Sequence, residues 1–253
     1  MMIRNSILAL LAATSLVFGG VPAAALADET HVAVAANFTE PAKEIAAKFE
    51  ARTGHKVVLS FGSSGQFYTQ IAHGAPFEVF LSADTERPQK AEAEGYAVPG
   101  SRFIYAVGRL VLWSATPGLV NANGAVLKSD KWQKLAIADP KSAPYGLAAI
   151  ETMKKLGLYE QLQPKIVQGS SITQAFQFAS TGAAELGFVA LSQVINEPVG
   201  SRWVVPAGDH TPIEQGAVLL KTGADNVAAK AFVRFLKGSE AKAVIKRFGY
   251  EVP

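Results

Sequence analysis

Short apolar runs alternate along the chain with longer segments in which apolar residues recur every three or four positions. The first pattern predicts buried strands and the second predicts amphipathic helices. Glycine or proline stands at many of the boundaries, as at Gly54 and Gly157. Strands are predicted at 31–36, 56–61, 78–81, 103–107, 110–113, 135–138, 165–168, 186–190, 203–205 and 217–220. Helices are predicted at 39–52, from the turn at 62–65 to about His73, and at 145–156, 172–180, 228–236 and 241–248.

This order of elements occurs twice in the chain. In each half a strand, a turn, a helix and a second strand lead to a Gly-Ser-Ser turn. The interval from Asn37 to Ser64 equals the interval from Tyr145 to Ile172. Alternating strands and helices predict the α/β class, here with two lobes that each hold a mostly parallel sheet flanked by helices. Ligands bind such sheets at the carboxyl ends of the strands, where these turns are expected.

The chain is expected to cross between the lobes twice, near 107–110 and near 207–215. The second crossing is rich in proline and glycine, which disfavour regular structure. The first lobe is therefore predicted to be discontinuous, with residues 28–108 plus 215–253, and the second lobe to hold residues 109–214. The crossing strands would form a hinge.

The N-terminal segment 1–27 has the pattern of a cleavable secretory signal. Arg4 precedes an almost wholly apolar stretch at 6–18, and a run of small residues ends at Ala27. The alternative is a membrane anchor, but the stretch is short and is followed by two glycines and a proline. We expect cleavage after Ala27, export, and a periplasmic protein that does not span the membrane.

Composition narrows the possible partners. Of the 253 residues, 49% are hydrophobic and 18% are charged, which excludes a disordered chain. The net charge is only +3 and no run of four basic residues occurs, so nucleic acid is not an expected partner. The absence of cysteine excludes disulfides, thiolate zinc sites and a cysteine nucleophile. The four histidines are scattered, so we predict no direct metal site.

The four turns that open helices are candidate anion sites. The start of a helix has unpaired backbone N–H groups and a partial positive charge, and it binds anions without a basic side chain. Each turn alone is explained as a helix cap; four turns around one cleft would form a cage of donors. The side-chain donors are the hydroxyls of Ser63, Ser64, Ser170 and Ser171, the amide of Asn37 and the phenol of Tyr145.

None of these turns contains an acidic or basic residue. Monohydrogen phosphate carries a proton and needs an acceptor, whereas a fully deprotonated tetrahedral dianion needs only donors. A set of turns with donors and no acidic residue therefore favours an ion such as sulfate or molybdate over phosphate. Glu40 and Asp139 lie nearby in the sequence and are assigned to helix capping or to the surface.

Several segments then resemble a known family. The segments 35–38, 60–65, 74–84, 143–146 and 187–192 are similar to those of the periplasmic molybdate-binding proteins of ABC transporters, which are type II periplasmic binding proteins. The resemblance covers nearly the whole chain after the signal. The stretch from Gly74-Ala75-Pro76 to Asp84 is fairly specific, whereas Gly-Ser-Ser alone is not.

The resemblance implies two α/β lobes that close on one oxyanion, held by serine hydroxyls and by backbone amides at helix starts. Many members have a hydroxyl residue beside the first turn and a tyrosine at the position of Phe188, so the exact donor set and the preference between molybdate and tungstate stay open. Carried over by position, the oxyanion ligands are Ala36 (backbone), Asn37, Ser64, Tyr145 and Ile172 (backbone), with Ser63 and Ser171 as second choices.

The resulting hypothesis is a monomeric solute-binding protein, with no cofactor, that captures molybdate or tungstate and delivers it to an ABC permease. A G-x-x-x-x-G-K-[ST] motif is absent, so the ATPase would be another protein. The alternatives are a binder of another oxyanion such as sulfate, or of a small organic acid. A remote alternative is an exported serine hydrolase using Ser64, but 62–65 is not G-x-S-x-G and no histidine has a catalytic context. We therefore predict no enzyme and no catalytic residue.

Overall fold

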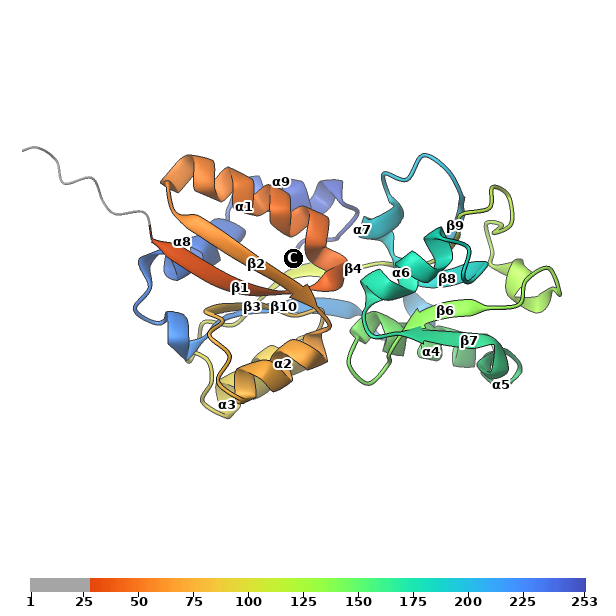
Figure 1. Ribbon diagram of the computed structural model, residues 1–253, viewed down its shortest axis with the longest axis horizontal. Coiled ribbons are helices and arrows are strands. Elements are labelled where there is room, and N and C mark those ends of the chain that lie inside the picture. The colour runs from red at the N-terminus through yellow and green to blue at the C-terminus, as the bar shows by residue number, and fades with distance from the viewer. Residues whose placement is uncertain (1–27) are drawn as a thin grey trace, which may run out of the picture.

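The computed structural model describes residues 28–253, so the predicted signal peptide lies outside the described residues. The chain forms two five-stranded sheets side by side along the long axis of the molecule (Figure 1). We call the first sheet and its helices the first lobe, and the second sheet and its helices the second lobe. The first sheet has the order β2 (Lys56–Gly62), β1 (Glu29–Ala35), β3 (Val79–Leu81), β10 (Ile213–Leu219) and β4 (Phe103–Gly108). The second has the order β7 (Ile166–Gly169), β6 (Leu135–Ala138), β8 (Leu186–Ala190), β5 (Leu110–Ser114) and β9 (Ser201–Val204).

Both sheets have the same topology. In the first, β10 runs antiparallel to its neighbours β3 and β4, and β1 is parallel to β2 and β3. In the second, β5 is the reversed strand, antiparallel to β8 and β9, and β6 is parallel to β7 and β8. Each reversed strand is reached by a crossing from the other lobe, from β4 to β5 and from β9 back to β10. The prediction of two α/β lobes with mostly parallel sheets is therefore confirmed.

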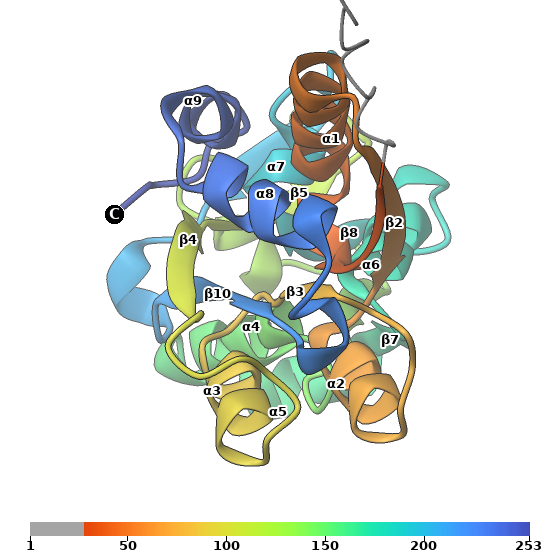
Figure 2. The ribbon, with the colours of Figure 1, turned by 90° about the vertical axis from the view of Figure 1, so that its left-hand side faces the viewer.

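Helices cover both faces of the first sheet (Figure 2). Val32 and Val34 pack with one group of helices, whereas Ala33 between them packs with the other, because side chains alternate along a strand. The first group holds α1 (Thr39–Thr53), α8 (Val227–Leu236) and α9 (Ser239–Arg247), and the second holds α2 (Ser64–Ala72) and α3 (Glu86–Ala93).

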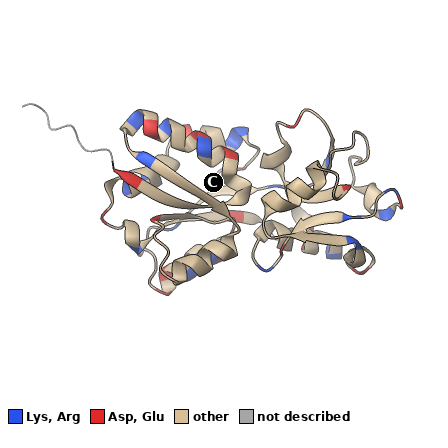
Figure 3. Cartoon of the chain, viewed as in Figure 1, with Lys and Arg blue, Asp and Glu red and all other residues tan. Residues whose placement is uncertain are grey.

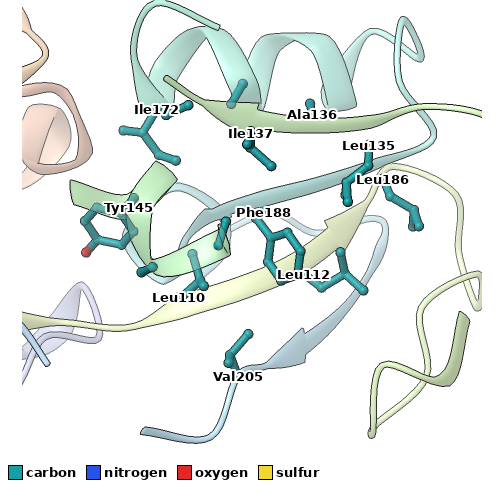
Figure 4. Packing of buried hydrophobic residues seen from close by; sticks show 14 of the residues in the cluster. Leu110, Leu112, Leu135, Ala136, Ile137, Tyr145, Ile172, Leu186, Phe188 and Val205 are labelled. Carbon is teal, nitrogen blue, oxygen red and sulfur yellow. The ribbon is translucent and has the colours of Figure 1, made fainter. Parts of the chain in front are cut away.

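The second lobe has a larger apolar cluster that reaches the junction between the lobes. Leu112 and Phe188 pack in its centre, and Tyr145 lies at its edge with the hydroxyl directed away from the apolar side chains (Figure 4). The helices of this lobe are α4 (Pro144–Lys155), α5 (Tyr159–Leu162), α6 (Ile172–Ser180) and α7 (Leu191–Val194). Short 3₁₀ turns complete the chain: η1 (Ala36–Phe38), η2 (Ala125–Lys128), η3 (Gln163–Lys165), η4 (Ala207–Asp209) and η5 (Lys221–Gly223).

Several elements differ from the sequence prediction. Helix α3 was not predicted, because only Pro88 and Ala91 of its eight residues are buried and the segment has no apolar periodicity. The short helices α5 and α7 were not predicted either. Strand β10 begins at Ile213 rather than at 217, and Gly216, one of the glycines of the second crossing, lies within it, at a register shift where Tyr105 of β4 is the extra residue.

Candidate functional site

Strand register brings four helix starts to one place. Ala35 at the end of β1 lies opposite Gly62 at the end of β2, and Ala138 at the end of β6 lies opposite Gly169 at the end of β7. Parallel strands that end level place the segments after them side by side. Turn η1, which continues into α1, and helix α2 therefore meet at the edge of the first sheet, and α4 and α6 meet at the edge of the second.

The four N-cap residues follow the internal repeat. They are Ala35 and Ser63 in the first lobe and Ala143 and Ser171 in the second. The sequence interval from Ala35 to Ala143 is the same as that from Ser63 to Ser171. This equal spacing pairs Ser64 with Ile172 as the first helical residues. The repeated Gly-Ser-Ser motif is thus offset by one position between the lobes.

These helix starts enclose a small cavity. The cavity is narrow, because the two lobes touch beside it. Six of the seven predicted site residues line it, whereas Ser171 does not. Among the described residues that line the cavity, Tyr145 is the one ionisable side chain, and there is no carboxylate. The lining residues are Ala35, Ala36, Asn37, Gly62, Ser63, Ser64, Ala83, Ala143, Pro144, Tyr145 and Ile172.

The serine hydroxyls at the cavity differ in what they bond. Ser64 is 1% exposed, and its Oγ accepts the N–H of Ala83 at 2.9 Å. Its own hydroxyl proton therefore remains available to a group in the cavity. Ser63 forms a capping box with Gln66, in which each side chain accepts the other residue's backbone N–H at 3.4 Å. Ser171 caps α6 by accepting the N–H of Gln174 at 3.3 Å, and this places its hydroxyl in the cap rather than at the cavity.

Five buried polar side chains join the lobes beside the cavity, and we call them the interlobe hub: Asn37, Tyr145, Ser192, Gln215 and Tyr250. Asn37 Nδ2 donates to Gln215 Oε1 at 2.9 Å and to the Tyr250 hydroxyl at 3.0 Å. Gln215 Nε2 donates to the Tyr145 hydroxyl at 3.2 Å. The Asn37 carbonyl oxygen accepts from Ser192 Oγ at 2.8 Å and from the Tyr250 hydroxyl at 2.7 Å.

The hub changes the role expected for Asn37. Its amide was predicted to donate to an anion, but both of its N–H groups donate within the hub. The Tyr145 hydroxyl oxygen accepts from Gln215 and its own proton stays available, so its role as a donor to an anion stays a prediction. Further unpaired donors are the backbone N–H groups at the starts of η1 and α4. Pro144, the first residue of α4, has no N–H, so the Tyr145 N–H is the first of that helix.

The tyrosines near the junction are neutral hydrogen-bonding groups. Burial raises the pKa of Tyr145 and of Tyr105 well above the ordinary value for a phenol. Burial also raises the pKa of Tyr250 to about 12, although its hydrogen bonds with Ser192 and Asn37 oppose the rise. The junction therefore carries no phenolate charge near neutral pH, and the field at the cavity comes from the helix starts.

The lobes also touch at the rim of the cleft. Gly65 N donates to Ser142 O at 2.9 Å, and Arg87 Nη2 donates to Lys141 O at 3.0 Å. A Cβ on Gly65 would lie 2.9 Å from Ser142 Cα, so glycine permits this close approach of the two backbones. Figure 3 shows charged residues mainly on the outer helices and loops, whereas the ribbon where the lobes meet is mostly uncharged.

Sequence reasoning placed the two nearby carboxylates correctly but missed part of the hub. Glu40 is exposed and pairs with Lys43 at 2.7 Å, and Asp139 accepts the N–H of Lys141 at 3.1 Å in the loop before α4. Gln215 and Tyr250 belong to no motif. The available signal for Gln215 was a buried polar residue within an otherwise apolar strand.

Comparison with known proteins assigns the family. Residues 30–251 match the model for bacterial extracellular solute-binding proteins. The chain is 63% identical to the molybdate-binding protein ModA of Rhodobacter capsulatus, over 94% of each chain. It is 58% identical to the molybdate-binding protein ModA of Azotobacter vinelandii, over 90% of this chain and 91% of the relative.

A solved structure agrees with these relatives. The periplasmic molybdate-binding protein of Azotobacter vinelandii superposes with a TM-score of 0.86 and 46% identity, over 88% of this chain and 99% of the other. The match includes both lobes and therefore the cleft between them. The chain belongs to the family of bacterial extracellular solute-binding proteins.

Proposed function

We propose that this chain captures molybdate, with tungstate as a near-equivalent, in the cavity between its lobes. One observation carries the proposal: four helix starts and the Ser64 hydroxyl surround a cavity that has donors and no carboxylate among its described lining residues. A dehydrated dianion supplies only acceptors, so it satisfies such a site. The names of the relatives at 63% and 58% identity support molybdate as the ion.

Selection against sulfate would follow from ion size. Molybdenum–oxygen bonds are longer than sulfur–oxygen bonds, and rigid donors set for the larger ion leave the smaller one with unmade hydrogen bonds. Each buried donor left unpaired costs about 1–3 kcal/mol. The small cavity also favours a compact ion over an extended organic acid.

The protein would act as a carrier rather than an enzyme. The Ser64 hydroxyl accepts from a backbone N–H, and the four histidines make their contacts elsewhere in the described chain, so no base activates this serine. No cofactor is needed, because the proposed cargo is the ion itself.

Export and delivery complete the proposal. Cleavage after Ala27 would release the chain to the periplasm, where the closed, loaded monomer docks on an ABC permease. No helix among residues 28–253 is both long and apolar enough to cross a membrane. The lobe boundaries proposed are 28–108 plus 215–253 and 109–214, which agree in outline with the crossings after β4 and β9.

Calorimetric titration of the mature protein with molybdate, tungstate, sulfate and phosphate tests the proposal. We expect one-to-one binding of molybdate and tungstate that is far tighter than that of the other two anions. If neither heavy oxyanion binds and sulfate or an organic acid binds instead, the proposed cargo is wrong and the fold assignment stands.

A further inference from the structure

Gln215 occupies an unusual position for a polar side chain. It is 0% exposed and lies on β10, the strand by which the chain returns to the first lobe. The ladder between β10 and β4 shifts register between Gln215 and Gly216. The residue without a partner in this shift is Tyr105 of β4, since Gln215 lies opposite Ala106 and Gly216 lies opposite Ile104. The Gln215 side chain lies at the junction of the two lobes and bonds to Tyr105 and to Tyr145.

The amide of Gln215 makes a different bond to each lobe. Its Oε1 accepts from Asn37 Nδ2 and from the Tyr105 hydroxyl, both at 2.9 Å and both in the first lobe. Its Nε2 donates to the Tyr145 hydroxyl of the second lobe at 3.2 Å. Asn37 and Tyr145 each line the cavity, from opposite lobes, and lie at the starts of η1 and α4.

We infer that Gln215 is a positioning residue that sets the width of the closed cavity and thereby the size of oxyanion that it accepts. This inference rests on the proposed function. Gln215 does not line the cavity and touches no ligand itself. It fixes the distance between two helix starts that face each other across the cavity, because one amide bonds the side chain of each. The exclusion of a smaller ion depends on that distance being fixed, since lobes that close further would coordinate it fully.

The backbone of Gly108 packs directly against the contact between Gln215 and the Tyr145 hydroxyl. It is the last residue of β4, directly before the crossing into the second lobe. A Cβ at this position would lie 2.0 Å from the Tyr145 hydroxyl oxygen and 2.7 Å from Gln215 Nε2. Gly108→Ala would therefore displace the same contact by steric pressure, without removing any hydrogen-bonding group of Gln215 or Tyr145. It is an independent test of the same geometry.

The experiment compares affinities for molybdate and sulfate in the mature protein and in Gln215→Met, which keeps the side-chain length and removes the amide. We expect the ratio of the two affinities to fall by about tenfold or more in the variant, which corresponds to the loss of the one hydrogen bond by which Gln215 reaches the second lobe. Gly108→Ala should lower the same ratio. Combining Gln215→Met with Tyr145→Phe should lower it little further, because both changes remove the same Gln215–Tyr145 bond.

The matched control is Thr152→Val in α4, the helix that begins with Pro144 and Tyr145. Thr152 is 0% exposed, and its hydroxyl bonds only within that helix, to the Ala148 carbonyl at 2.8 Å. This change should therefore lower the melting temperature and leave the affinity ratio unchanged.

The inference is overturned if Gln215→Met and Gly108→Ala weaken the binding of both anions equally and keep the wild-type affinity ratio. If Gln215→Met does not fold, the Gly108→Ala result decides. A wild-type protein that binds neither heavy oxyanion instead overturns the proposed function, and this inference with it.

Discussion

The two halves of the cleft share one scaffold but contribute different donors. Each lobe places two helix starts at level strand ends, and the N-caps of one lobe are separated from those of the other by one constant sequence interval. In the first lobe the helix after the second strand begins with Ser64, whose hydroxyl is buried and free to donate. In the second lobe the equivalent residue is Ile172, which packs into the apolar cluster. The repeated part is the backbone, and the hydroxyl at this helix position is present in the first lobe only.

This difference suggests an order of events in binding. The first lobe offers backbone N–H groups and a hydroxyl on one surface, whereas the second offers backbone N–H groups without a hydroxyl at the matching position. An anion would be held first by the first lobe, and closure of the second lobe would complete its coordination. The interlobe hub then keeps the two halves at a fixed distance.

The largest expected effect is that of Ser64→Ala. The change removes a hydroxyl donor to the anion and leaves the N–H of Ala83 without its acceptor. A hydrogen bond to a charged group contributes about 1.5–3 kcal/mol, so the molybdate affinity should fall by about 10-fold to 100-fold. Titration calorimetry measures the loss. An unchanged affinity would show that the first lobe holds the anion by its backbone alone, as the second lobe does.

Tyr145→Phe removes a hub acceptor and leaves the backbone N–H of the residue in place, so its effect on molybdate affinity should be smaller, less than about tenfold. It should instead weaken the discrimination against sulfate. The same titrations measure both quantities. A loss as large as that of Ser64→Ala would mean that the phenol contacts the anion directly, and the two halves would then each supply a side-chain donor.

Sequence reasoning succeeded where chemistry is local. Capping residues, strand ends and the equal spacing within the two halves are written in short segments, so the turns at the cleft could be located from the sequence. The ligand set with Ser64, Tyr145 and Ile172 came from the family resemblance, and these three residues line the cavity. Sequence reasoning failed where partners are distant. Asn37 and Gln215 are 178 residues apart and Asn37 and Tyr250 are 213 apart, and no local pattern pairs them. Helix α3 was missed for another reason, since its surface is almost wholly polar.

The Gly-Ser-Ser repeat also shows how a motif can mislead. It suggested that Ser63 and Ser171 were equal second choices for the site. Both are N-caps, but Ser63 lines the cavity and Ser171 does not. The offset of one position between the motif and the helix start decides which side chain follows the cap, and the structure shows which of the two serines borders the cavity.

Ser171→Ala is the matched counterpart of Ser64→Ala. The change removes the cap of α6, which should lower the free energy of unfolding by about 1 kcal/mol. Molybdate affinity should change less than threefold, since the hydroxyl does not border the cavity. Urea unfolding and calorimetry together measure the two quantities. The proposed asymmetry between the lobes is wrong if affinity falls as far as in Ser64→Ala.

The smallest effect near neutral pH is expected from the hub tyrosines. Below about pH 10 a tyrosine is protonated in both the folded and the unfolded chain, so its contribution to stability is fully present. Between pH 10 and about 12 the unfolded chain loses the proton of Tyr250 while the folded chain keeps it, because burial raises the pKa of Tyr250 to about 12. The free energy of unfolding should then fall by roughly 1 kcal/mol per pH unit for this residue.

Urea unfolding of the wild type and of Tyr250→Phe at pH 9, 10 and 11 isolates this contribution. Every other ionisable group is present in both proteins, so the difference between the two slopes is assigned to Tyr250. We expect the variant to be less stable at pH 9 and to lose less stability from pH 10 to pH 11. Equal slopes would mean that the hub opens to solvent before the chain unfolds. Molybdate affinity should stay flat from pH 6 to pH 9, since Tyr145, the one ionisable side chain among the described lining residues, stays protonated in this range.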